Sequence, residues 1–184
     1  MLTNFKLDNM PKIHIVDRYL EAVKHLGIKN DNQGLDFFLS SSDKIDVSVF
    51  PKDYIVFVIG GQHATKILPN EKIISIIKKV NKPVLLVGGS EDFERGERII
   101  KNTNNTINTC GKYSILQSAS LVQQAKMVIT HDTGMMHIAA AFQQKIYSVW
   151  GNTVPEFGMY PYMQSEQSKR IEVKGLNCRP CSKI

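Results

Sequence analysis

One stretch of the chain brings an acid, a hydroxyl, a glycine and a histidine together: residues 128–142, V-I-T-H-D-T-G-M-M-H-I-A-A-A-F. An apolar run ends in a short polar turn, and a helix of small residues follows. Asp132 or Thr133 can cap that helix, and Gly134 lets a ligand approach the backbone closely. The free N–H groups of the first turn, with His137 one turn further, predict a phosphate or diphosphate site. A structural turn that binds nothing is the alternative.

Two earlier loops carry charges that suit a nucleotide. In residues 60–66, G-G-Q-H-A-T-K, the glycines allow tight geometry and Lys66 adds a cation, although the Walker A spacing is absent. Taken alone, this loop is better explained as a glycine turn with a surface lysine. In residues 88–92, G-G-S-E-D, Glu91 and Asp92 follow a strand. A carboxylate there can accept ribose hydroxyls or cap the next helix, and both roles stay open.

A fourth loop, residues 151–158, is built from small, polar and proline residues that fit a rigid wall, with Glu156 facing either ligand or solvent. Together the four loops offer a cation, a helix N-terminus and a ribose carboxylate, which predicts binding of a diphosphate nucleotide. The sequence lacks the G-x-S-x-G, H-E-x-x-H and G-x-G-x-x-G motifs. This absence argues against a serine hydrolase, a zinc protease and a nicotinamide dehydrogenase.

Alternating strands and helices must position these loops. We expect strands at 54–59, 83–87, 106–109, 127–130 and 145–150, and helices at 69–80, 91–101, 114–126 and 134–142. This order predicts an α/β fold, a Rossmann-like parallel sheet with helices on both faces. Because ligands of such sheets bind beyond the carboxyl ends of the strands, the four loops should share one rim.

The residues before this alternation form a separate part. Apolar side chains at helical spacing predict an amphipathic helix over 13–26, ended by Gly27, and residues 28–50 read as a polar connection with one short strand. We therefore divide the chain into 1–50, a helix and connecting segment, and 51–184, a nucleotide-binding domain with a C-terminal tail.

Charge, cysteines and targeting segments indicate which partners and which compartment to expect. The net charge is +6, and residues 169–184 hold five basic residues against one acidic residue. A solvated tail is the preferred interpretation; a basic interaction domain that binds anionic lipid or nucleic acid is the alternative. Cys178 and Cys181 form a C-x-x-C pair without two further ligands nearby, so no metal is expected. With no signal peptide or membrane span in the sequence, we expect a cytoplasmic protein.

The same loops carry a family resemblance. Residues 128–142, followed by W-G-N-T-V-P-E-F-G-M-Y-P-Y, resemble glycosyltransferase family 9, the heptosyltransferases that build the lipopolysaccharide inner core. The loops G-G-Q-H-A-T-K-I-L-P and V-G-G-S-E-D-F-E-R match the family's order upstream. The resemblance covers residues 54–162, and D-T-G-x-x-H is its most specific element.

The resemblance implies the C-terminal half of a GT-B enzyme, in which two Rossmann-like domains face each other across a cleft. It makes residues 51–184 the nucleotide-sugar-binding domain and residues 1–50 a segment from the interdomain region. That half binds a nucleotide-sugar donor, typically ADP-heptose, in an inverting transfer that needs no cofactor and no metal. By motif, the residues expected to bind the nucleotide sugar are Lys66, Glu91, Asp92, Thr133, Gly134, Met135 and His137.

Individual roles follow from the same resemblance. Lys66 neutralises the donor phosphate, and Thr133 with Gly134 binds the diphosphate through the helix N-terminus. Glu91 or Asp92 holds the ribose. His137 and Met135 line the nucleotide pocket.

The motif leaves two roles open for Asp132: it orients the turn, or it touches the sugar. Asp132 is also the one candidate catalytic residue in this chain. The family's catalytic base belongs to the facing N-terminal domain, which also binds the acceptor, a lipopolysaccharide core or lipid A precursor. We therefore expect this chain alone to be inactive, with any membrane contact peripheral, at the inner face of the inner membrane. No nucleic acid partner is expected. A non-catalytic nucleotide-binding module of the same fold is the alternative.

Overall fold

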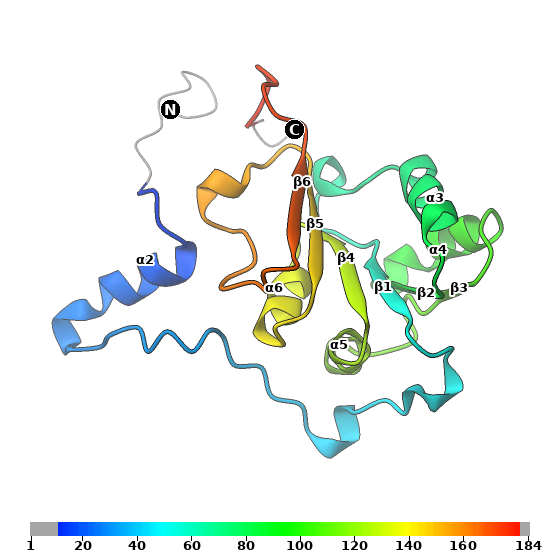
Figure 1. Ribbon diagram of the computed structural model, residues 1–184, viewed down its shortest axis with the longest axis horizontal. Helices are drawn as coiled ribbons and strands as arrows, with labels where there is room; N and C mark the ends of the chain where they lie inside the picture. Colours follow the sequence, from blue (N-terminus) through cyan, green and yellow to red (C-terminus); the bar gives the residue numbers. More distant parts are fainter. Residues whose placement is uncertain (1–10, 181–184) are drawn as a thin grey trace.

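The computed structural model describes residues 11–180, and its centre is a six-stranded, fully parallel sheet in the order β3-β2-β1-β4-β5-β6 (Figure 1). The strands are β1 (Ile55–Val58), β2 (Val84–Val87), β3 (Thr106–Asn108), β4 (Met127–His131), β5 (Ile146–Trp150) and β6 (Lys169–Glu172). The helices are α2 (Ile15–Ala22), α3 (Asn70–Lys79), α4 (Phe93–Ile100), α5 (Ile115–Gln123) and α6 (Gly134–Ala141). This is the doubly wound strand order, which reverses between β1 and β4.

Both faces of the sheet are buried, which explains why its central strands are continuous apolar runs. In β1, Ile55 and Phe57 pack with α3 and α4, whereas Val56 and Val58 pack with α5 and α6. Figure 1 shows these helix pairs on opposite sides of the sheet. Because side chains alternate along a strand, a strand covered on both faces needs an apolar residue at every position.

The alternation expected after residue 51 is confirmed, with ends shifted by at most three residues. Pro69 is the residue before α3 rather than its first residue. The helix expected at 91–101 begins with a 3-10 turn, Ser90–Asp92, before α4 starts. The Rossmann-like class with helices on both faces therefore follows from the sequence pattern.

Two expectations about irregular segments were wrong. Residues 28–50 contain no strand; they hold two 3-10 turns, Ser41–Asp43 and Val47–Val49. The basic tail is not wholly solvated, because Lys169–Glu172 is β6, which pairs with β5 at the edge of the sheet. An edge strand with exposed basic side chains lacks the apolar pattern of a buried strand, and so its sequence gave no strand signal.

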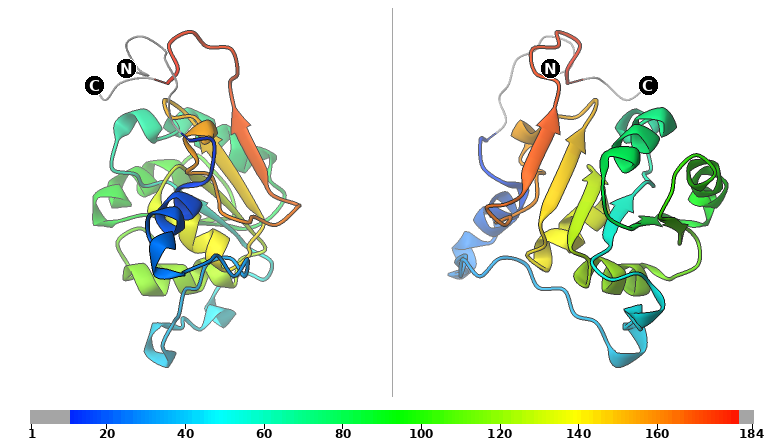
Figure 2. Two further views of the ribbon diagram at one scale, coloured as in Figure 1. Left: turned by 90° about the vertical axis from the view of Figure 1, so that its left-hand side faces the viewer. Right: turned by 45° about the vertical axis from the view of Figure 1, so that its right-hand side comes forward.

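The N-terminal helix is α2 followed by a 3-10 turn, Lys24–Leu26, and Gly27 ends it with φ +77°, as expected. This helix packs on the loop after β5. The backbone N–H of Ile15 donates to the Gly158 carbonyl over 2.8 Å, and His14 Nε2 donates to the Tyr160 carbonyl over 2.7 Å. Figure 2 shows α2 lying beside that loop.

The connection from α2 to β1 runs as an extended strap past α6 and α5 (Figure 2). Phe37 stacks edge-on against Phe142, and the N–H of Ile45 donates to Ser120 Oγ over 3.0 Å. Residues 14–45 thus contact the sheet domain at the loop after β5, at α6 and at α5. The assignment of residues 1–50 to an interdomain region stays a prediction.

Candidate functional site

Three of the four loops meet at an ion pair. Lys66 Nζ lies 2.7 Å from Asp132 Oδ2, and Thr153 Oγ1 donates to the same oxygen over 3.0 Å. These residues follow β1, β4 and β5, so the shared rim expected from the parallel topology is present. The Asp132 side chain is 7% exposed and that of Lys66 is 23% exposed. A lysine is therefore held at the rim by a nearly buried counter-ion.

The loop after β5 approaches this cluster closely through its backbone. A methyl group added at Gly151 would lie 2.8 Å from the Thr65 carbonyl oxygen. Since normal contacts are longer, only glycine allows these two loops to touch. The fourth loop therefore forms a wall of the rim, as its composition predicted.

The loop after β2 reaches the rim through Asp92. A methyl group at Gly60 would lie 2.3 Å from Asp92 Oδ2, and the same oxygen accepts from the Gly89 N–H over 3.0 Å. Asp92 is buried, and this burial raises the pKa of its carboxyl group. Of the two roles left open by the sequence, Asp92 takes the capping role.

Glu91 is exposed, and its carboxylate folds over Gly89. It forms no ion pair or hydrogen bond with Lys66 or Asp132 among the interactions described between residues 11 and 180. Of the two ribose candidates, Glu91 is thus the carboxylate that remains accessible. Ribose binding by either residue stays a prediction.

The N-terminus of α6 differs from expectation in how it is capped. Thr133 occupies the N-cap position, but its side chain makes no capping hydrogen bond. The Asp132 carboxylate accepts hydrogen bonds from Lys66 and Thr153 instead. The expected side-chain cap was therefore wrong, and among residues 11–180 no side chain caps the first turn of α6.

Space is open above that turn. Gly134, the first residue of α6, is exposed, and a methyl group added to it would meet no atom within 4 Å. Its φ does not lie in the left-handed region. Neither packing nor backbone conformation requires glycine here, and the role of Gly134 in leaving room for a ligand stays a prediction.

The two residues expected to line the nucleotide pocket lie further along α6. His137 is partly buried; burial lowers the pKa of its imidazole, while the charge of Asp132 opposes the shift. Met135 is partly buried and packs against the core formed with α5 and α6. His137 thus belongs to the electrostatic surroundings of the ion pair, and Met135 has at least a packing role.

Three residues at this site were not singled out by the sequence. Thr153 binds Asp132, His131 accepts from the Leu68 N–H over 3.0 Å, and Arg95 donates to the Leu68 carbonyl. Arg95 lies in α4, a helix with several charged residues. A contact across 27 positions leaves no local signal in the sequence.

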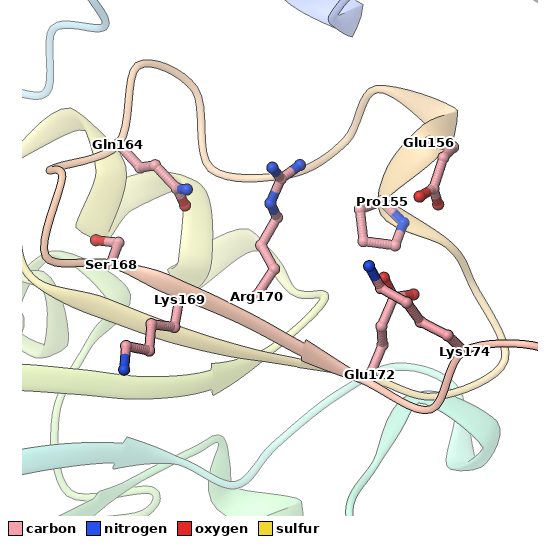
Figure 3. A pocket seen from close by; sticks show the side chains of 8 residues that line it. All are labelled: Pro155, Glu156, Gln164, Ser168, Lys169, Arg170, Glu172 and Lys174. Atoms are coloured by element: carbon pink, nitrogen blue, oxygen red, sulfur yellow. The ribbon is translucent and has the colours of Figure 1, made fainter.

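A hollow lies along β6 (Figure 3). Its volume is about 410 Å³, and Figure 3 shows the side chains that line it: Pro155, Glu156, Gln164, Ser168, Lys169, Arg170, Glu172 and Lys174. Cations and carboxylates are mixed in it. Glu172 also pairs with Arg179 at 3.1 Å. None of the residues expected to bind the donor lines this hollow.

The remaining expectations concern metals and membranes. In residues 11–180, no three acidic, histidine or cysteine side chains gather as a metal site would require. Cys178 is exposed, and Cys181 lies outside the described residues. No helix within the described range has the length and apolar character to cross a bilayer.

Comparison with known proteins points to one family. The family model described as "Glycosyltransferase family 9 (heptosyltransferase)" matches residues 1–184. Lipopolysaccharide heptosyltransferase 2 of Salmonella typhimurium is 30% identical over 79 residues, which are 40% of this chain and 23% of that protein.

Solved structures show the same fold. The family 9 glycosyltransferase of Veillonella parvula superposes with a TM-score of 0.79 at 21% identity, covering 90% of this chain and 51% of that one. A heptosyltransferase of E. coli solved with ADP gives a TM-score of 0.68 at 21% identity, covering 94% of this chain and 54% of that one. The chain therefore spans about half the length of these relatives.

Proposed function

The chain belongs to glycosyltransferase family 9, the heptosyltransferases, and from this membership we propose that it binds the nucleotide-sugar donor of a glycosyl transfer. The proposed ligand is an ADP-heptose-type sugar, with its diphosphate between Lys66 and the N-terminus of α6. One observation carries the proposal: Lys66, held by a nearly buried carboxylate, shares a rim with an open helix N-terminus that has no side-chain cap.

The electrostatics of this rim suit a leaving diphosphate. When the sugar departs, negative charge develops on the diphosphate oxygens. A lysine and the backbone N–H groups of a helix N-terminus stabilise that charge more in the transition state than in the ground state. Asp132 holds Lys66 at the rim before the donor arrives, so the cation is already positioned.

The finer assignments rest on the relatives. One relative is named a lipopolysaccharide heptosyltransferase, and two E. coli structures were solved with ADP and with ADP-2-deoxy-2-fluoro heptose. We propose that this chain is the donor-binding, C-terminal half of a GT-B enzyme of lipopolysaccharide core biosynthesis. The acceptor and the catalytic base then belong to a facing domain, the chain alone does not turn over, and neither cofactor nor metal takes part.

Calorimetry with ADP tests the donor site. The Lys66→Met variant should weaken ADP binding about 10–100-fold, the range of one charge-assisted hydrogen bond of about 1.5–3 kcal/mol. Lys72→Met, on the exposed side of α3, serves as the matched control and should bind like wild type. Lack of ADP binding by the wild-type chain, or equal binding by Lys66→Met, would remove the donor site.

Two further experiments address the alternatives. Joining the chain to a family 9 N-terminal domain and assaying sugar transfer separates an enzyme half from a non-catalytic nucleotide-binding module. A free basic tail is less favoured by the structure, because Arg179 is tied to the Glu172 side chain and the Thr153 carbonyl. Binding to anionic vesicles that persists without residues 169–184 would argue against the tail as an interaction segment.

A further inference from the structure

The loop that carries Lys66 is held by side chains from two other elements. It runs from Ile59, after β1, to Asn70, where α3 begins. Most of its residues are exposed or only partly buried. Its own backbone closes one 3-10 turn, with the Lys66 N–H donating to the His63 carbonyl over 2.9 Å. Such a loop needs outside contacts to hold its lysine in one place.

Arg95 of α4 supplies the first set of contacts. Its guanidinium donates to the Ile59 carbonyl at the start of the loop and to the Leu68 carbonyl at the end. Its Nε donates to Asn70 Oδ1 over 2.7 Å. A single planar group thus connects both ends of the loop, a geometry that the point charge of a lysine cannot reproduce.

His131, the last residue of β4, supplies the second contact. Its ring is fully buried, and Nε2 accepts from the Leu68 N–H over 3.0 Å. Accepting at Nε2 requires a neutral ring, and burial lowers the pKa of His131 to about 4. The Gly60 carbonyl opposes this shift, although Nδ1 makes no well-formed hydrogen bond. Both backbone groups of Leu68, two residues after Lys66, are therefore bound by side chains.

We propose that Arg95 and His131 are positioning residues for Lys66, so that they set the affinity for diphosphate without touching it. The inference rests on the proposed donor site. His131 directly precedes Asp132 in the chain. His131 binds the backbone of the lysine loop at Leu68, and Asp132 binds the Lys66 ammonium. The lysine is thereby located from both its backbone and its charged end.

The test measures ADP affinity by calorimetry on the whole chain. Arg95→Lys keeps the charge but loses the planar fork, and His131→Leu removes the acceptor for Leu68. Each should weaken ADP binding about 3–30-fold, since a displaced Lys66 loses part of a charge-assisted hydrogen bond of about 1.5–3 kcal/mol. His131→Gln, which offers an amide acceptor, should recover most of the loss. Arg98→Met, an exposed arginine on the same helix, should bind like wild type.

A double variant separates positioning from general damage to the fold. If Arg95 acts through Lys66, then Lys66→Met with Arg95→Lys should bind ADP no more weakly than Lys66→Met alone. Amide exchange at Leu68 should quicken in Arg95→Lys and His131→Leu while core amides of β1 stay protected. The inference would be overturned if the losses of ADP affinity in the double variant added up. It would also be overturned if Lys66→Met weakened ADP binding while the Arg95 and His131 variants bound like wild type. In both cases the donor site itself would stand. A wild type that does not bind ADP would instead overturn the donor site.

Discussion

Replacing Gly134 with alanine separates the fold of this chain from its proposed ligand. The added methyl group meets no protein atom within 4 Å, and the backbone does not need positive φ. Alanine also favours a helix over glycine by at most about 1 kcal/mol. The substitution should therefore leave the free energy of unfolding unchanged or raise it slightly. In a chain of this size, 1 kcal/mol corresponds to about 2–4 °C in Tm.

Ligand binding should respond in the opposite direction. A phosphate oxygen must come within about 3 Å of the first amides of α6 to accept their hydrogen bonds, and the methyl group occupies that approach. At 100 times its Kd, ADP stabilises the folded wild type by about 2.7 kcal/mol, or about 5–11 °C. A variant that binds 100-fold more weakly keeps only about 0.4 kcal/mol, or about 1–2 °C, at the same concentration.

Thermal unfolding with and without ADP measures both effects in one assay. The control is Ile115→Ala, at the exposed first residue of α5, which should keep the full shift in Tm caused by ADP. If Gly134→Ala retains the wild-type shift, then the ligand does not approach this helix N-terminus. A markedly lower Tm of Gly134→Ala without ADP would show instead that the fold needs glycine at this position. That result would contradict the open space around Gly134 in the structure.

Three further substitutions test the packing around the site. Asp132→Asn should lower the free energy of unfolding by about 1–3 kcal/mol in urea titrations, because it leaves the partly buried Lys66 without its counter-ion; an unchanged midpoint would show that the pair contributes nothing. Because burial lowers the pKa of His131 from 6.5 to about 4, the unfolded chain takes up this proton first as the pH falls. The free energy of unfolding should thus decrease by up to about 3 kcal/mol between about pH 6.5 and pH 4, and His131→Gln should remove that part of the dependence. Gly158→Ala should destabilise the contact with α2, because Gly158 has φ +78° and a methyl group there would lie 2.5 Å from the Ile13 carbonyl; amide exchange at Ile15 reports this loss, and unchanged protection would contradict it.

The meeting of the loops at one rim could be predicted from the sequence, because it follows from the topology of the sheet. Lys66, Asp132 and the loop after β5 lie far apart in sequence, yet their convergence follows from one inference, that the strands are parallel. The same logic does not assign individual hydrogen bonds. Asp132 could cap α6 or bind a cation, and only its distance of 2.7 Å from Lys66 decides between them.

The features that the sequence analysis missed have no local pattern in the sequence. β6 is an exposed edge strand whose basic residues read as a tail, and its position depends on pairing with β5. The sequence analysis gave Arg95 no role, although its guanidinium contacts both ends of the Lys66 loop. Long-range contacts of this kind depend on side-chain reach, which hydrophobic periodicity does not encode.

The sequence by itself determined the layered α/β fold and the family of this protein, because apolar alternation sets strands and helices, and loop motifs mark a rim. Only the tertiary structure decided which carboxylate caps, which binds lysine and which side chains hold the lysine loop. The physical reason is that a charged group in a half-buried site selects among competing partners by distance and desolvation, and both depend on the folded chain.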